Sequence, residues 1–434
     1  MATSQVLSEQ EWLCAVQKRL RTNDCKILKV TVSQLGGDVG GFLGDHLRVR
    51  LSVMTHLSSS PETQEVAFFV KRIPLDHQSQ GELVQSSQGF PKETGLFSTL
   101  FSLYPESENP WAPQCYFVRP DALVLDDLIY EKFRLAGRKK CLDYAHCVLL
   151  LRALAVFHAG SIIIEENQAK KTNKPCRLNE LYPDLLFENF FVDDNSFKTN
   201  MWFHSAVESL ASSVILLEKY KRNINVNEVN IQTFKKFIYQ LYEIVKPSNK
   251  YRNVVSHGDL WTNNMLFKYD EDDETPVQVR MVDFQLVRYA PPAIDVMTFL
   301  HINTPQEFRI ANIEKFLSLY HNCLGEELRR HGYRVEDYLP WPEFRESCDV
   351  YNIAGCIYAP CYHTFNIMDE SVLRERLTPE KFSEFFFGNR YELVEYCCET
   401  DPDYKERLLT ELEELVECML TRQSKTFEDT SKSN

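Results

Sequence analysis

The segment from Ser256 to Asp283 constrains the fold more than any other part of the chain. It contains HGDLWTNN and then two apolar runs, MLFKY and VQVRMV, which are separated by the acidic turn DEDDETP. Two short apolar runs around a turn predict a β-hairpin. The start of the first strand and the end of the second lie at the same end of an antiparallel ribbon. Asn264 and Asp283 are therefore expected to lie side by side.

This hairpin brings together residue types that suit phosphoryl transfer. The amide oxygen of Asn264 and the carboxylate of Asp283 are ligands that Mg²⁺ prefers, and Asp259 is close enough in sequence to accept the proton of an attacking hydroxyl. Each residue alone also fits a structural role: a turn carboxylate, an Asx cap or a strand-end turn former. Their order, together with features nearer the N-terminus, favours a kinase.

A glycine-rich loop lies between two predicted strands at 29–35 and 46–53. Its sequence GGDVGGFLGD includes Gly37, Gly40 and Gly41, where backbone N–H groups can approach an anion closely. We interpret these glycines as a cover for phosphates, although an ordinary flexible hairpin loop stays open as the alternative. The loop contains no Walker pattern, because it lacks GK[ST].

Two charged residues follow this loop in the order that a kinase requires. Lys71 ends the apolar run 66–70, and Glu93 lies near the start of a predicted helix at 90–104. A lysine at a strand end and a glutamate in a first helical turn are usually solvated. Here Glu93 can instead turn inward and pair with Lys71, which would fix the ammonium over a phosphate.

The pattern of strands and helices predicts two lobes and an α+β fold class. Further strands at 115–118 and 122–125 complete a five-stranded antiparallel sheet, which together with a helix forms an N-terminal lobe over residues 1–127. A larger, mainly helical lobe is expected over 128–422, followed by a polar disordered tail at 423–434. The longer helices of the second lobe are predicted at 142–158, 203–221, 226–245, 306–323, 351–365, 379–397 and 402–420.

Composition excludes several other classes of protein. The 48 basic and 62 acidic residues give a net charge of −14, which disfavours a broad surface for nucleic acid or anionic membrane. The N-terminus has no signal-peptide pattern, and no apolar run is long enough to predict a membrane span. Thirteen cysteines form no paired framework, so we expect free thiols and a cytoplasmic protein.

Three further residues near the central segment are expected to be structural. His257 is predicted to bridge the two loops around the hairpin, and His158 to form hydrogen bonds at the end of its helix. Asp295 is either a helix N-cap or a brace for the backbone around His257. Aromatic residues at helical spacing (Trp261, Tyr358, Tyr362, His363 and 385–387) are expected to belong mainly to the core.

Several of these segments together resemble a known family. GGDVGGFLGD, FFVKRIP, LVLDDL, LAVFHAGS, HGDLWTNNMLFKYD and VDFQLVRYAPPAIDV are similar to the ecdysteroid kinase-like (CHK-type) small-molecule kinases, relatives of choline kinase and aminoglycoside phosphotransferases. The resemblance spans most of the chain. It departs from the usual pattern at Val156, where an Arg is common, and at Asp126, where a Glu is common.

The resemblance implies a protein-kinase-like bilobal fold and transfer of the γ-phosphate of ATP to a hydroxyl. By this similarity Asp259 corresponds to the catalytic base, and Asn264 and Asp283 to the Mg²⁺ ligands. Lys71 corresponds to the phosphate-binding lysine, and Glu93 to its partner.

The resemblance also implies an adenine-facing connector between the lobes. It corresponds to Leu125–Leu128 and so includes Asp126, Asp127 and Leu128.

We therefore expect an ATP- and Mg²⁺-dependent kinase of a lipophilic alcohol, most concretely an ecdysteroid. A kinase of choline-like or aminoglycoside substrates and a nucleotide-binding pseudokinase stay open as alternatives. The sequence leaves undetermined the acceptor, the hydroxyl that is phosphorylated and the oligomeric state.

Overall fold

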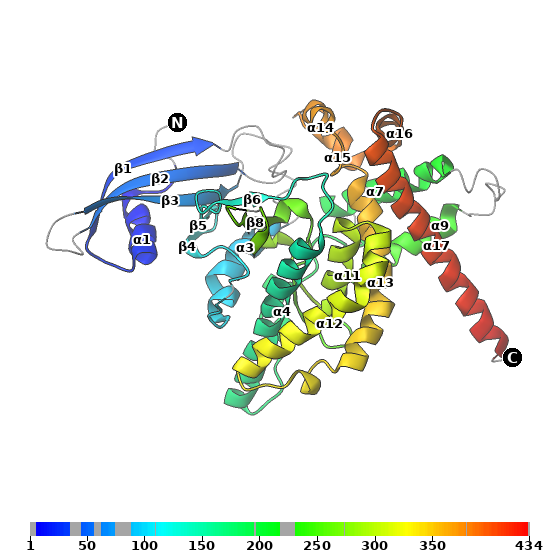
Figure 1. Ribbon diagram of the computed structural model, residues 1–434, viewed down its shortest axis with the longest axis horizontal. Helices are drawn as coiled ribbons and strands as arrows, with labels where there is room; N and C mark the ends of the chain where they lie inside the picture. The colour runs from blue at the N-terminus through cyan, green and yellow to red at the C-terminus, as the bar shows by residue number, and fades with distance from the viewer. Residues whose placement is uncertain are drawn as a thin grey trace.

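A computed structural model describes residues 6–34, 45–55, 62–73, 88–108, 110–194, 197–217, 231–272, 274–378 and 380–432, with side chains to 422. Gly37, Gly40 and Gly41 lie outside the described residues. The elements form two parts, a sheet with a helix against it and a larger helical part (Figure 1). The protein is thus α+β and bilobal, as its sequence predicted.

The smaller lobe is built on five antiparallel strands in the order β1-β2-β3-β5-β4. All five strands were predicted, and each is longer than expected by one to six residues. Their bounds are β1 Cys25–Gln34, β2 Asp45–Thr55, β3 Glu62–Arg72, β4 Cys115–Arg119 and β5 Ala122–Asp126. Alternate side chains of β2 are buried, which is the pattern of a sheet with one covered face.

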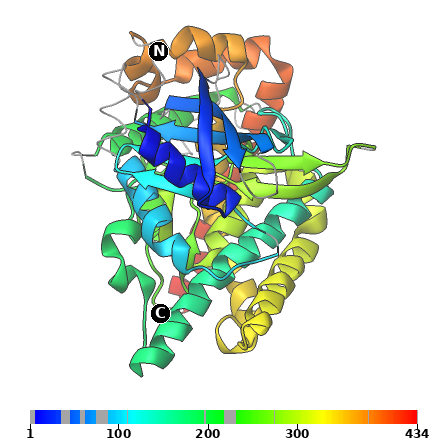
Figure 2. The same cartoon turned by 90° about the vertical axis from the view of Figure 1, so that its left-hand side faces the viewer.

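Helix α1, Glu9–Leu20, covers this sheet. It begins with a capping box in which Ser8 and Glu11 exchange hydrogen bonds. Trp12 is buried and stacks against Phe68 of β3, with ring centroids 6.2 Å apart. The helix therefore contributes to the core of the small lobe (Figure 2).

The segment that carries Glu93 is helical, but it is not one uniform α-helix. Helix α3 spans Gly89–Gly95, a wider π-helical stretch follows at Leu96–Leu100, and a 3₁₀ turn ends at Leu103. Six aromatic rings meet behind this segment and join the two lobes. They are Phe97, Phe101, Tyr104, Trp111, Phe157 and Phe284.

Helix α4, Tyr144–Thr172, is the central helix of the larger lobe. It continues 14 residues past the predicted end at His158 and packs against α12 and the strands β7 and β9. By length and composition it could cross a membrane, but 72% of its most apolar window is buried inside the protein. Its apolar character is accounted for by packing in the core.

Among the other helices of this lobe, α11 and α12 pack against α4, whereas α7, α9, α16 and α17 share a second core with α13 (Figure 1). Their bounds are α5 Leu178–Leu181, α6 Pro183–Leu186, α7 Lys198–Ser213, α9 Ile231–Tyr239, α10 Leu241–Ile244, α11 Pro292–Asn303, α12 Gln306–Arg330, α13 Trp341–His363, α14 Glu370–Arg376, α15 Phe382–Phe387, α16 Tyr391–Thr400 and α17 Pro402–Lys432. Helices α11 and α13 pack against each other, and α13 also packs against α17.

Several predicted helix bounds were wrong. The helix expected at 379–397 is two helices, α15 and α16, because the chain turns at Gly388. Helix α13 begins ten residues before the predicted start, with prolines at its first turn. The backbone of α17 is helical through Lys432, where the sequence predicted a disordered tail over 423–434.

The predicted hairpin is present and is joined by strands that the sequence analysis missed. Strands β8, Met265–Tyr269, and β9, Pro276–Met281, pair antiparallel, and β6, Phe133–Leu135, adds to β8. The hairpin projects from one side of the molecule (Figure 2). A second pair, β7 Val254–Ser256 with β10 Arg288–Ala290, holds the chain just before and just after the central segment.

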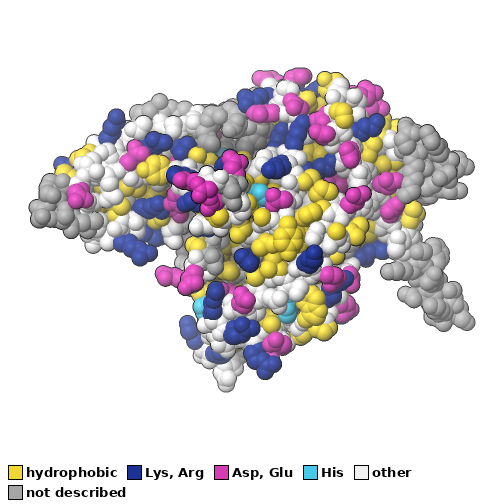
Figure 3. Space-filling view, in the orientation of Figure 1, with side chains coloured by type: hydrophobic (Ala, Val, Ile, Leu, Met, Phe, Trp, Pro, Cys, Tyr) yellow, Lys and Arg dark blue, Asp and Glu magenta, His cyan; other side chains and the backbone are white. Residues whose placement is uncertain are grey.

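Charged side chains of both signs are interspersed on the face drawn in Figure 3. All thirteen cysteines are free thiols, as the sequence predicted.

The close contact between α4 and the aromatic residues suggests a stability test at Gly160. A Cβ there would lie 2.3 and 2.5 Å from ring atoms of Tyr104. We expect Gly160→Ala to lower the free energy of unfolding by about 1–3 kcal/mol, since overpacking outweighs the helix-propensity gain of about 1 kcal/mol. Chemical denaturation of the two proteins measures the difference.

Gly325→Ala is the matched control, because this glycine is also helical and its Cβ would come no closer than 3.1 Å to Val335. It should change stability by less than about 1 kcal/mol. Equal effects of the two substitutions would contradict the packing described for Tyr104.

Candidate active site

Lys71 joins the two lobes through a pair of carboxylates. Its Nζ lies 2.6 Å from Glu93 Oε2 on α3 and 2.6 Å from Asp283 Oδ1 after β9. Lys71 and Glu93 are both buried, so their pairing, which the sequence predicted, is shielded from water. Burial alone would lower the pKa of Lys71, but the carboxylates of Asp283 and Glu93 raise it above its ordinary value. The ammonium therefore stays charged.

Asn264 and Asp283 lie beside each other at the base of the hairpin. Met265 pairs with Met281, and the backbone N–H of Val282 donates to the carbonyl of Asn264 at 3.0 Å. This is the convergence that the hairpin predicted. Asp283 has φ 67°, a left-handed conformation that is uncommon for a residue other than glycine. Backbone conformations of this kind are often found at functional sites.

Asp259 lies in the loop after β7, and both of its carboxylate oxygens are hydrogen-bonded. The Nδ2 of Asn264 donates to Oδ2 at 2.8 Å, and the hydroxyl of Tyr362 on α13 donates to Oδ1 at 2.9 Å. Burial and the nearby charge of Asp283 raise the pKa of Asp259 to about 7. The predicted base is thus a buried carboxylate beside a candidate metal ligand.

The backbone of this loop is held by Asp295 of α11. One carboxylate oxygen accepts from the N–H of His257 at 2.6 Å, and the other accepts from the N–H of Gly258 at 3.0 Å. His158 Nε2 also lies 3.1 Å from Asp295. Of the two roles that the sequence left open for Asp295, the brace is the one observed, because Pro291 occupies the N-cap.

His257 and Gly258 are fitted to their places in the loop. The Nε2 of His257 lies 3.2 Å from the carbonyl of Val282, so His257 bridges the two loops as predicted. Gly258 has φ +81°, and a Cβ there would lie 2.4 Å from the carbonyl oxygen of Leu286. Only glycine fits this position without strain.

The guanidinium of Arg288 is buried next to this loop and was not predicted from the sequence. Arg288 of β10 lies 2.9 Å from Glu188 and donates to the hydroxyl of Tyr358 at 2.6 Å. The ring of Tyr358 stacks on Tyr362, with centroids 5.8 Å apart. Tyr358 and Tyr362 were expected in the core, and they are buried there, but their hydroxyls belong to the site.

The predicted connector between the lobes is engaged in structural contacts. Asp126 pairs with Arg19 and accepts from the hydroxyl of Tyr116 at 2.7 Å. Asp127 is buried and pairs with Arg48 at 2.8 Å, and the side chain of Leu128 is also buried. Both carboxylates are therefore paired with arginines of the protein itself. The role of this connector in nucleotide binding stays a prediction.

The donors present suit Mg²⁺ and phosphate. Because the Nδ2 of Asn264 is bound to Asp259, the opposite side of the amide presents its oxygen away from that carboxylate. The side chain of Asp283 is 28% exposed and so is partly accessible to solvent. A carboxylate, an amide oxygen and a buried ammonium form a donor set suited to a hard cation and the phosphates it carries.

The brace at Asp295 can be tested by Asp295→Asn. The amide would set an N–H donor against a backbone N–H, so we expect a loss of about 1–3 kcal/mol in the free energy of unfolding at neutral pH. Burial alone would raise the pKa of Asp295, but hydrogen bonds from His158 and the backbone of His257 lower it. The ionised carboxylate therefore stabilises the folded protein fully above about pH 3.9, its pKa in the unfolded chain. This stabilisation is lost as the pH falls through the lower pKa that Asp295 has in the folded protein.

Thermal unfolding from about pH 7 to about pH 3 measures this dependence. The difference between the wild type and Asp295→Asn should shrink at the acid end. The control is Asp143→Asn at the N-cap of α4, where asparagine caps as well as aspartate. A stability difference between the wild type and Asp295→Asn that grew on acidification would contradict the role of Asp295 as a brace.

Comparisons with known proteins place these residues in context. None of the proteins with curated descriptions matches the chain in sequence. Among solved structures, the chain is similar to the GDP and kanamycin complex of APH(2")-IIia, at 12% identity and TM-score 0.37, over 87% of this chain and 95% of that one.

Two further solved structures are similar to the chain. It resembles the GDP complex of wild-type aminoglycoside 2'-phosphotransferase-IIIa, at 10% identity and TM-score 0.36, over 94% and 98% of the two chains. It also resembles a microcompartment-associated aminopropanol kinase, at 11% identity and TM-score 0.32, over 79% and 95%. The family assignment does not depend on these distant likenesses.

A model of the ecdysteroid kinase-like family matches residues 39–333. The matched region contains Lys71, Glu93, Asp259, Asn264 and Asp283. Because the match covers more than half of the 434 residues, the chain belongs to the ecdysteroid kinase-like family and is a small-molecule kinase.

Proposed function

We propose that the protein transfers the γ-phosphate of ATP, with Mg²⁺, to a hydroxyl of a lipophilic alcohol, and that this alcohol is an ecdysteroid. The observation that carries the kinase activity is the position of Lys71 between Glu93 and Asp283, since it joins a phosphate-binding ammonium to a metal-binding carboxylate. Bound Mg²⁺–ATP supplies the phosphoryl group and neutralises its developing charge.

The residues of the larger lobe hold and deprotonate the acceptor in this proposal. Asp259 accepts the proton of the attacking hydroxyl, while Asn264 and Tyr362 fix the direction of its carboxylate. Asp295 fixes the loop that carries it. Asn264 and Asp283 would hold Mg²⁺, and Lys71 would contact the phosphates.

In the smaller lobe, we propose that Gly37, Gly40 and Gly41 cover the phosphates. We also propose that the backbone of Asp126, Asp127 and Leu128 faces the adenine, because the two carboxylates are already paired.

Aromatic side chains next to Asp259 favour a neutral, apolar acceptor. The Tyr362 hydroxyl contacts the carboxylate, and its ring contacts Trp202 of α7 at 5.7 Å between centroids. The two further carboxylates of the site, Asp283 and Glu188, are paired with Lys71 and Arg288. An aminoglycoside acceptor would need carboxylates that are not already neutralised. A choline-like acceptor would need such carboxylates or an open aromatic cage, whereas the rings of Trp202 and Tyr362 are buried.

Two substitutions separate the chemical step from metal binding. Asp259→Asn retains the size of the side chain but cannot accept a proton, so we expect kcat to fall by about 10²–10⁴-fold while nucleotide still binds. Asp283→Ala removes a metal ligand and the partner of Lys71, and it should abolish Mg²⁺-dependent ATP turnover. Rates of product formation and calorimetric titration with nucleotide measure the two effects.

The matched control is Asp272→Ala, which removes an exposed carboxylate at the tip of the β8–β9 hairpin. Its turnover should equal that of the wild type. Undiminished turnover in Asp283→Ala would overturn the metal assignment, and undiminished turnover in Asp259→Asn would overturn the role of the base.

The acceptor class is tested by incubating the protein and Mg²⁺–ATP with ecdysteroids, other lipophilic alcohols, choline and an aminoglycoside. We expect phosphorylated ecdysteroid, with its modified hydroxyl identified by mass spectrometry, and no phosphorylated choline or aminoglycoside. Product from other lipophilic alcohols alone would correct the substrate but not the class. Phosphorylation of the cationic acceptors alone would overturn the class, and no product from any acceptor would favour a pseudokinase.

A further inference from the structure

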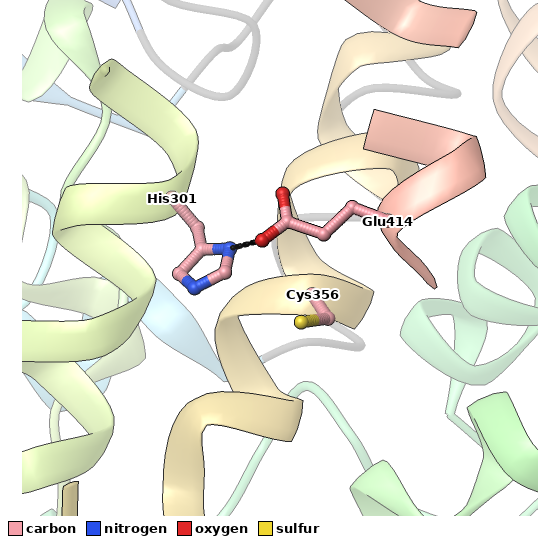
Figure 4. Close-up of side chains that lie close together, drawn as sticks. All are labelled: His301, Cys356 and Glu414. Atoms are coloured by element: carbon pink, nitrogen blue, oxygen red, sulfur yellow. Dashed lines mark ion pairs between the residues drawn. The ribbon is translucent and has the colours of Figure 1, made fainter. Parts of the chain in front are cut away.

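Three potential metal ligands from three helices meet in the larger lobe, outside the proposed kinase site. They are His301 of α11, Cys356 of α13 and Glu414 of α17, and their ligand atoms all lie within 4.8 Å of one another. Figure 4 shows the imidazole, thiol and carboxylate converging. His301 and Cys356 are each 2% exposed, so this cluster is deep in the helical packing.

The imidazole of His301 is oriented as a metal ligand. Its Nε2 lies 2.9 Å from the side-chain oxygen of Asn352, which can only accept, so Nε2 carries the hydrogen and Nδ1 carries a lone pair. Nδ1 faces Glu414 Oε1 at 3.7 Å, beyond hydrogen-bond distance. A neutral nitrogen lone pair thus faces a carboxylate, an arrangement that a cation between them would stabilise.

Tight packing against α13 fixes the His301 imidazole in place. A Cβ at Gly355 of α13 would lie 2.3 Å from the His301 ring. The imidazole therefore rests directly on the backbone of α13, one residue before Cys356. The amide of Asn352, which fixes the imidazole, also donates to the Cys356 sulfur at 3.5 Å. Such contacts behind the ligands are typical of metal sites in proteins.

The three donors together suit one kind of metal. A thiolate sulfur, an imidazole nitrogen and a carboxylate oxygen are ligands that Zn²⁺ accepts in proteins.

Two groups of the cluster would face the cation with negative charge. Glu414 is paired with Arg309, whose Nη2 lies 2.7 and 2.6 Å from the two carboxylate oxygens. The second negative group would be the thiolate of Cys356, and binding would release its thiol proton, as thiolate ligation requires.

We propose that His301, Cys356 and Glu414 bind Zn²⁺ and that the ion fastens α17 to α11 and α13. Because the ligands come from three helices and two of them are buried, the ion has a structural role. Helix α11 carries Asp295, and α13 carries Tyr358 and Tyr362, so the same ion would stabilise the helices that position the catalytic loop.

The test uses the full chain, purified in reductant, and does not depend on an acceptor or on kinase activity. We expect about one Zn²⁺ per chain by elemental mass spectrometry. After removal of the metal, titration with Co²⁺ should give a thiolate-to-metal charge-transfer absorption that saturates at one equivalent. The metal-free chain should unfold at a lower temperature than the loaded chain.

Cys356→Ser is expected to lose the bound ion, the charge-transfer absorption and the metal-dependent rise in unfolding temperature. Cys361→Ser is the matched control, because Cys361 is also a buried thiol of α13 but is not among the three ligands. Should Cys356→Ser fail to fold, Glu414→Gln, at a partly exposed position, should weaken Co²⁺ binding and so lower the same absorption at one equivalent.

A wild-type chain without thiolate-to-cobalt absorption would overturn the proposal. So would absorption that is equally strong in the wild type and in both ligand variants.

Discussion

The structure depends on one buried ammonium shared by two carboxylates that belong to different parts of the chain. Lys71 of β3 meets Glu93 of α3 and Asp283 of the larger lobe, across sequence separations of 22 and 212 residues. A buried charge is costly unless it is paired, so the smaller lobe, helix α3 and the loop after β9 must lie together. Glu93 also accepts from the N–H of Phe284 at 3.0 Å, which fixes the residue next to Asp283.

Apolar contacts support the same junction. Phe284 lies against Phe97, Phe101, Trp111 and Phe157, so the residue after the candidate metal ligand is packed among rings from both lobes. Aromatic pairs in edge-to-face contact are worth about 0.5–1.5 kcal/mol beyond their buried area. Aromatic contacts and buried ion pairs thus both hold the junction between the two lobes.

Much of this arrangement could be predicted from local patterns. The hairpin was recognisable because two apolar runs surround an acidic turn, and antiparallel pairing then placed Asn264 beside Asp283. All five strands of the smaller lobe and the pairing of Lys71 with Glu93 were also predicted. The break between α15 and α16 could have been found, since Gly388 and Asn389 are turn residues within an otherwise helical pattern.

Other features depend on long-range contacts that a sequence pattern does not contain. Tyr362 lies 103 residues from Asp259, in an apolar helix where an aromatic residue is expected in the core. Arg288 gave no signal, because its partners Glu188 and Tyr358 are distant in sequence. The ion pairs of Asp126 with Arg19 and of Asp127 with Arg48 likewise form only when the sheet and α1 come together.

The brace at Asp295 has a consequence for how the protein folds. Its carboxylate joins the loop after β7 to His158 of α4, 137 residues away, and His158 in turn reaches Tyr320 of α12, across 162 residues. Contacts over such separations carry a large loop-closure entropy and form slowly. Helices can form from local sequence, but the catalytic loop acquires its shape only when α4, α11 and α12 have docked. Recovery of activity after denaturation therefore reports the last stage of folding of the larger lobe.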